Sequence, residues 1–70
     1  MDIPAAATER LARLYALACQ AFGNPPAAAR FMMTPHPELS GRTPFHVALT
    51  EVGGREVEEV IERGLHGLPA

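Results

Sequence analysis

The sequence is short of the side chains from which catalytic and metal sites are usually built. Its 70 residues include one cysteine, Cys19, one serine, Ser40, and one aspartate, Asp2. A single cysteine excludes an internal disulfide and a zinc site made of several thiolates, and we see no way to assemble a Ser-His-Asp triad. The three histidines stand 10 and 20 residues apart, without the close spacing that many metal sites use. We therefore expect no enzymatic activity and no metal or cofactor.

The chain also lacks a long apolar run and a basic start. The longest stretch without charge, residues 14–29, contains Gln20, Asn24 and two prolines, which argues against a transmembrane helix. The first four residues carry no basic side chain, in contrast to a secretory signal. We expect a cytoplasmic protein.

Lysine is absent, and the remaining charge is distributed unevenly. The formal net charge is -2. Residues 1–50 hold four arginines and three acids, whereas residues 51–70 hold two arginines and five glutamates. Phosphate groups of a nucleic acid would repel the acidic final segment. This distribution favours a protein partner for the C-terminal part.

Large apolar side chains are also scarce. Apolar residues make up 47% of the chain, but 12 of these 33 residues are alanine. A domain of about 60 residues buries only about 60% of the surface that its unfolded chain exposes, and chains below about 70–80 residues usually need a staple. We expect one compact unit whose core is completed by another chain.

The apolar spacing predicts an all-α fold, a small bundle of four short helices joined by proline and glycine turns. A first helix over residues 4–22 has a predicted buried stripe, and Asp2 or Thr8 could cap it. That stripe is Leu11, Leu14, Tyr15, Ala18 and Phe22. Gly23 ends this helix. A second helix over residues 25–33 should bury Ala28, Phe31 and Met32, and Pro35 ends it.

In the second half of the chain, the apolar spacing and the proline and glycine positions predict a loop and two more helices. Leu39 should insert into the core from the loop, and Thr43 should cap a third helix that ends at Gly53 or Gly54. Its predicted buried side chains are Phe45, Ala48, Leu49 and Val52. A fourth helix over residues 54–63 should bury Val57, Val60 and Ile61, pair Glu59 with Arg63, and end at Gly64. We see no strand pattern.

Surplus apolar side chains suggest binding to another protein. Of the neighbouring methionines Met32 and Met33, one should pack inward and the other should remain outside. The tail from Leu65 to Ala70 is also apolar. A solvated monomer rarely exposes so much apolar surface, so we interpret the chain as a protein-binding module.

Three segments together resemble the toxin-binding domain of Xre/MbcA/ParS-type antitoxins. They are residues 29–32 (ARFM), 37–45 (PELSGRTPF) and 50–67 (TEVGGREVEEVIERGLHG). The most specific signal is the order and spacing of a few residues, which we take as the structural motif. These are Leu39, Gly41, Thr43, Pro44, Thr50, Gly53, Val57 and Gly67. The resemblance covers about residues 22–67, so we expect an N-terminal helix over 1–22 and the antitoxin domain over 23–70.

The resemblance implies a type II toxin–antitoxin system and a partner, a RES-domain toxin that consumes NAD. In this family the C-terminal region of the antitoxin reaches toward the active-site cleft of the toxin. The fourth helix and the tail would do so here. The implied partner-binding residues are Arg55, Glu58, Glu59, Glu62, Arg63, Gly64, Leu65, His66, Gly67 and Leu68. From charge alone, we expect three of these glutamates to pair with toxin arginines that would otherwise hold the NAD pyrophosphate.

A second interpretation stays open at this point. The chain could be a small dimeric transcriptional regulator that contacts DNA phosphates through Arg10, Arg13, Arg30 and Arg42. Many relatives carry a helix-turn-helix-like region before the toxin-binding domain, whereas one helix precedes the resemblance here. We therefore do not expect this chain alone to bind DNA, although it could form a homodimer within a larger complex.

Overall fold

The computed structural model describes residues 2–66, with the side chain of His66 excluded. It contains the helices α1 (Ala5–Phe22), α2 (Pro25–Met33), α3 (Pro44–Val47) and α4 (Glu51–His66), and a 3₁₀ turn, η1 (Pro37–Leu39). No strand occurs among the described residues, where His36 and Arg42 form one isolated bridge. The predicted all-α class is confirmed.

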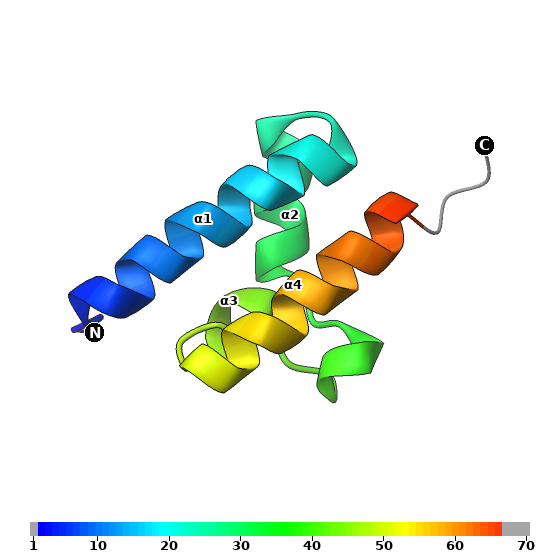
Figure 1. Ribbon diagram of the computed structural model, residues 1–70. Coiled ribbons are helices and arrows are strands. Elements are labelled where there is room, and N and C mark those ends of the chain that lie inside the picture. Colours follow the sequence, from blue (N-terminus) through cyan, green and yellow to red (C-terminus); the bar gives the residue numbers. More distant parts are fainter. Residues whose placement is uncertain (1, 67–70) are drawn as a thin grey trace.

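The two long helices, α1 and α4, pack directly on each other and run in the same direction (Figure 1). The short elements between them carry the chain back from the end of α1 to the start of α4. α2 packs on α1, α3 packs on both α2 and α4, and η1 packs on α4. The first and last helices of the chain therefore share one core.

That core is a single cluster of apolar side chains, most of them small or branched, to which every element contributes. Leu14, Leu39, Val57 and Ile61 are its largest fully buried side chains. Alanines fill the closest contacts, since Ala18, Ala28 and Ala48 are completely buried. The many alanines thus add little side-chain volume to the core, but they let the helices pack closely together.

α1 was predicted almost to its ends, but part of its buried stripe was wrong. Neither Asp2 nor Thr8 caps it: Pro4 occupies the cap position without a side-chain bond, and the Thr8 hydroxyl donates to the Pro4 carbonyl. Tyr15 and Phe22 are 37% and 39% exposed. Ala7, which was not part of the predicted stripe, is buried instead.

α2 begins and ends where the sequence predicted. Asn24 caps it, since its side chain accepts a hydrogen bond from the Ala27 amide at 2.8 Å, and proline suits the first turn because it lacks an amide hydrogen. Met32 is buried and Met33 is 63% exposed, which confirms that the pair is divided between core and surface. Phe31, expected inside, is only half-buried and packs against the core.

The loop after α2 confirms the prediction for Leu39, which is 1% exposed. The turn that inserts it ends in two residues with positive φ, Ser40 at 58° and Gly41 at 76°. Glycine adopts this left-handed conformation without the steric penalty of a Cβ. The loop is fixed to α4 by an ion pair between Glu38 and Arg63.

The junction between α3 and α4 differs from the prediction. Thr43 caps α3, because its hydroxyl oxygen accepts from the His46 amide, but α3 ends at Val47. Gly53 and Gly54 do not end a helix; both are buried inside α4. Thr50 is placed before α4, and its hydroxyl oxygen accepts from the Gly53 amide at 3.0 Å. The helix therefore starts earlier than a double glycine suggested.

Close approach of the backbone explains why these glycines lie within a helix. A Cβ at Gly53 would overlap the carbonyl oxygen of Val47 and lie 2.9 Å from the Thr50 hydroxyl oxygen. One at Gly54 would overlap the side chain of Arg10. Val52, predicted inside, is instead 68% exposed, and Val47 is buried. The lack of side chains lets α3 and α1 approach the first turn of α4.

The other end of α4 was also mispredicted. The helix continues through Gly64 to His66, because glycine lowers helix stability by only about 1 kcal/mol relative to alanine. Arg63 pairs with Glu38 of the loop instead of Glu59. Tertiary contacts thus replaced the local ion pair expected from sequence spacing.

Candidate functional site

The start of α4 is held in place by a side chain from α1. The Arg10 Nη1 atom donates to the carbonyl oxygens of Ala48 at 3.1 Å and Leu49 at 3.4 Å. These carbonyls lie just after the end of α3, where no following helical turn supplies amide hydrogens for them to accept. A guanidinium group there satisfies two acceptors and carries charge of the sign that a helix C-terminus favours. Arg10 therefore fixes α4 relative to α1.

The sequence-predicted partner-binding residues are brought together on α4. Val57, Val60 and Ile61 face the core and are buried. At 3.6 residues per turn, the opposite side of the helix carries the charged residues. Exposed residues on this outer face are Arg55, Glu58, Glu59, Glu62 and Arg63. We call this set the outer face of α4.

The two arginines of this outer face pair with glutamates of the same chain, so the charge that the face offers to a partner is negative. Arg55 pairs with Glu51 at 3.3 Å, one turn earlier in α4, and Arg63 pairs with Glu38. Among residues 2–65, whose side chains the structure describes, no ion pair involves Glu58, Glu59 or Glu62. Both cations of the outer face are therefore engaged within the chain, while three carboxylates remain available to a partner.

The last turn of α4 extends past the packed core. A Cβ placed on Gly64 would meet no atom within 4 Å, and Leu65 is 36% exposed. Gly67 and Leu68, also predicted to bind the partner, lie outside the described residues. The described part of α4 thus ends in a solvent-accessible turn next to the acidic outer face.

The predicted motif residues lie mainly in structural positions. Leu39, Pro44 and Val57 are buried, Thr43 caps α3, and Gly53 permits the close approach of Val47. These residues set the course of the chain from α2 to α4. They position the outer face of α4 and contribute little surface of their own.

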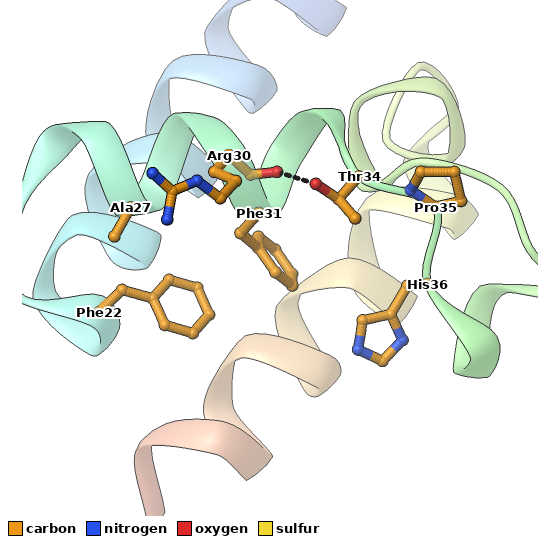
Figure 2. A pocket seen from close by; sticks show the side chains of 7 residues that line it. All are labelled: Phe22, Ala27, Arg30, Phe31, Thr34, Pro35 and His36. Carbon is orange, nitrogen blue, oxygen red and sulfur yellow. Dashed lines mark hydrogen bonds between the residues drawn. The ribbon is translucent and has the colours of Figure 1, made fainter.

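An aromatic pocket was not predicted from the sequence. It has a volume of about 290 Å³ and lies between the end of α1, α2 and the loop before η1. In Figure 2, Phe22, Phe31 and His36 line it in succession. The ring centroids of Phe22 and Phe31 are 5.0 Å apart, and those of Phe31 and His36 are 6.1 Å apart. The pocket could accept an apolar group next to the Arg30 guanidinium.

A second apolar hollow, of about 260 Å³, lies on another side of α2. It is lined by Leu11, Tyr15, Ala29, Met32, Met33 and Phe45, and we call it the Met33 groove. The only sequence signal for it was the surplus methionine, because its walls come from α1, α2 and α3. Helical spacing within one segment does not reveal a surface shared by three segments.

Tyr15 contributes a polar group at the edge of the Met33 groove. Its hydroxyl donates to the Pro25 carbonyl at 3.3 Å. Partial desolvation raises the pKa of this hydroxyl above its ordinary value of 10.0, and the neighbouring Cys19 thiol acts in the same direction. Tyr15 therefore stays protonated and uncharged well above neutral pH.

Among the described residues, no group of three or more histidine, cysteine or acidic side chains could hold a metal ion. Within the same part of the chain, none of the helices combines the length and the apolar character that crossing a membrane requires. Besides the acidic helix face and the two apolar hollows, the described residues form a polar cleft between α1 and α4. It is lined by Arg10, Arg13, Leu14, Glu51, Gly54, Arg55 and Glu58.

Comparison with known proteins bears on these surfaces. Residues 17–67, well over half of the chain, match a family model described as the antitoxin Xre/MbcA/ParS C-terminal toxin-binding domain. Neither the curated proteins nor the solved structures contain a match to the chain. The matched residues include all of α4, where the outer face lies.

Proposed function

The chain belongs to the family of Xre/MbcA/ParS C-terminal toxin-binding antitoxin domains, and from this we propose that it neutralises a RES-domain toxin in the cytoplasm as the antitoxin of a type II system. Inhibition comes from the end of α4 and the tail, which enter the cleft where the toxin binds NAD. The family match is the observation that carries this proposal. The accessible last turn of α4 supports the choice of surface.

The charges of α4 support a specific mode of inhibition. A pocket that binds the pyrophosphate of NAD requires cationic donors, for which arginine is well suited. Glu58, Glu59 and Glu62 offer carboxylates to such donors without first breaking an ion pair described in this chain. The antitoxin then competes with NAD for the same cations, and the role of the chain is binding rather than catalysis.

Deletion of residues 64–70 tests the inhibitory segment. Co-expression of the full chain with a RES-domain toxin should protect cells, and the truncated chain should not protect them. The buried face of α4 ends at Ile61 among the described residues, so the shortened chain should keep its helical circular dichroism and still melt cooperatively. Full protection by a folded truncated chain would show that the tail does not occlude the active site.

Neutralising the carboxylates tests the charge argument. The triple variant Glu58→Gln, Glu59→Gln, Glu62→Gln should bind the toxin at least about tenfold more weakly, because charged hydrogen bonds are stronger than neutral ones. Glu56→Gln is the matched control, since Glu56 is also exposed on α4 but was not assigned to the partner. Equal affinity of the triple variant and the control would contradict pairing with toxin arginines.

The described contacts do not favour the DNA-binding alternative. Of its four arginines, Arg10 donates to carbonyls after α3, and Arg42 donates to the Leu39 carbonyl at 3.2 Å. Two cations are thus already used in holding the fold. Phosphate binding by the few that remain would be weak and strongly dependent on salt.

A further inference from the structure

The aromatic pocket is a surface that the proposed toxin contact does not use. Its lining comes from the end of α1, from α2 and from the loop before η1, and includes no residue of α4. A cavity of about 150 Å³ with apolar walls is large enough for one benzene molecule. The volume of about 290 Å³ therefore accommodates one aromatic ring and a short polar group. It fits a single side chain of another protein better than a whole cofactor.

The walls of the pocket suit a further aromatic ring. The rings of Phe22 and Phe31 are tilted by 42° to each other, and those of Phe31 and His36 meet edge to face at 71° (Figure 2). Aromatic rings attract one another in tilted and edge-to-face arrangements, so an added ring can continue the series. The Arg30 guanidinium, which also belongs to the lining, can lie against the face of such a ring.

Arg30 gives the pocket a positive charge that no carboxylate of the lining balances. Arg30 is exposed, and among residues 2–65 no ion pair involves it. The described residues that line the pocket include no aspartate or glutamate. The polar cleft between α1 and α4 differs in this respect, since it holds two glutamates beside its arginines. The aromatic pocket thus combines apolar walls with a group that binds carboxylates well.

Local contacts form the pocket before any partner binds. Gly23, with a φ of 90°, ends α1, and Asn24 directly after it caps α2. This short turn fixes α2, and with it Phe31, beside the end of α1. His36 is held by its backbone bridge to Arg42. A pocket that is already formed loses little conformational entropy when it binds.

We propose that the aromatic pocket binds a segment of another protein in which an aromatic side chain stands next to an aspartate or a glutamate. The ring fills the pocket, and the neighbouring carboxylate accepts charged hydrogen bonds from the Arg30 guanidinium. The ring supplies most of the affinity, because an exposed ion pair contributes little. The carboxylate selects among partners that offer a ring.

A second copy of this chain does not offer such a segment. The chain contains four aromatic residues, Tyr15, Phe22, Phe31 and Phe45, and none of them has an aspartate or glutamate within three positions on either side. The partner is therefore a different protein. Because α4 does not line the pocket, the proposal does not depend on how a toxin is inhibited.

An NMR titration of the isotope-labelled full chain tests the proposal. The probe is the tetrapeptide Gly-Phe-Asp-Gly with both ends blocked. It should shift the amide signals of Phe22, Ala27, Phe31 and Thr34 with a dissociation constant at or below about 1 mM. Gly-Ala-Asp-Gly, which lacks the ring, should bind at least about tenfold more weakly. Gly-Phe-Asn-Gly, which lacks the charge, should bind at least about threefold more weakly.

Two variants and a matched control locate the contact. Arg30→Gln removes the cation, and Ala27→Glu adds a carboxylate to the pocket wall. Each should weaken binding of Gly-Phe-Asp-Gly at least about threefold. Ala27→Glu should fold well, because an acidic residue suits the first turn of a helix. Arg13→Gln is the control and should bind like the unmodified chain, since Arg13 is also exposed but lines the polar cleft instead. Circular dichroism establishes that each variant is folded.

Three results would overturn the proposal. The first is the absence of a saturable shift at the lining residues with about 10 mM tetrapeptide. The second is equal affinity for Gly-Phe-Asp-Gly and Gly-Phe-Asn-Gly, which would show that the carboxylate is not recognised. The third is tighter binding of N-acetylphenylalanine than of the tetrapeptide, which would assign the pocket to a small aromatic acid. None of these results bears on inhibition of a toxin by α4.

Discussion

At the scale of single residues, the glycines of α4 differ in what surrounds them. Gly53 is enclosed by the backbone of Val47 and the Thr50 side chain, whereas Gly64 faces open space. Both lie in the same helix, so they carry the same intrinsic helix penalty. Their replacement by alanine should therefore change stability in opposite directions.

Gly53→Ala should destabilise the fold by about 3 kcal/mol or more, because its Cβ meets backbone atoms that cannot turn aside. Gly64→Ala should stabilise it by about 0.5–1 kcal/mol, as expected for an unobstructed helical glycine. Urea unfolding followed by circular dichroism measures both free energies. A Gly53→Ala chain as stable as the unmodified one would contradict the close approach of α3 to α4.

Tyr15 provides a residue-scale prediction on pH. Its pKa in the folded chain is raised, first by partial desolvation and then by Cys19, so the folded state holds the proton more tightly than the unfolded state. The resulting stabilisation is present below pH 10 and is lost as the pH rises through the folded pKa. As Tyr15 is the only tyrosine, the absorbance of tyrosinate reports its titration directly.

The titration midpoint of the folded chain should exceed that of the chain in denaturant. Cys19→Ala should lower the folded midpoint without removing the whole difference, since desolvation is the larger cause. A folded midpoint at or below that of the unfolded chain would show that the hydroxyl is fully solvated.

At the scale of elements, the sequence predicted best the segments whose ends are set by local chemistry. Asn24 and two prolines start α2, and Thr34 followed by Pro35 ends it, so no tertiary contact is needed to define its bounds. The boundary between α3 and α4 failed because Gly53 and Gly54 resemble a helix end. Their role depends on Val47 and Arg10, which sequence spacing does not bring together.

The candidate surfaces also differ in whether the sequence could predict them. The acidic outer face lies on one helix, and its exposed glutamates alternate with buried valines in a pattern that the sequence displays. Both apolar hollows combine side chains from several elements. These hollows depend on the angles and distances between the helices, which helical spacing within one segment does not give. For this reason the spacing predicted Phe22 and Tyr15 as core residues, whereas they line the hollows.

The start of α4 gives an element-scale prediction. The Thr50 hydroxyl oxygen accepts from the Gly53 amide, and loss of such a cap typically costs about 1 kcal/mol. Thr50→Ala should lower the melting temperature by roughly 4–8 °C for a domain of this size. Thr50→Ser keeps the hydroxyl and should restore most of the loss. An equal loss in both variants would mean that the methyl group of Thr50, not its hydroxyl, stabilises the junction.

At the scale of the whole molecule, the fold extends beyond the residues that match the family. The match begins at residue 17, yet Ala7 and Leu14 are buried and Arg10 holds the α3–α4 junction. Leu14 therefore belongs to the same core as α4, and Leu11 packs against that core, although both precede the family match. A boundary placed at the start of the match would cut through this core.

A fragment of residues 17–70 should consequently lose its cooperative thermal transition. The fragment 2–66, which keeps α1 and the described part of α4, should retain it. Circular dichroism and differential scanning calorimetry on both fragments, at equal concentration, make this comparison. Cooperative melting of the shorter fragment near the temperature of the full chain would show that the start of α1 adds little to stability.

The packing of α1 directly on α4 joins two helices that a ribosome makes several seconds apart. Synthesis proceeds at roughly 5–20 residues per second, so the segment from Phe22 to His66 takes about 2–9 seconds. During that interval the inward side of α1, including Leu14 and Ala18, has no α4 to cover it. Unfinished chains therefore expose apolar side chains of α1 that the finished fold buries, and the shared core forms only when synthesis of α4 is complete.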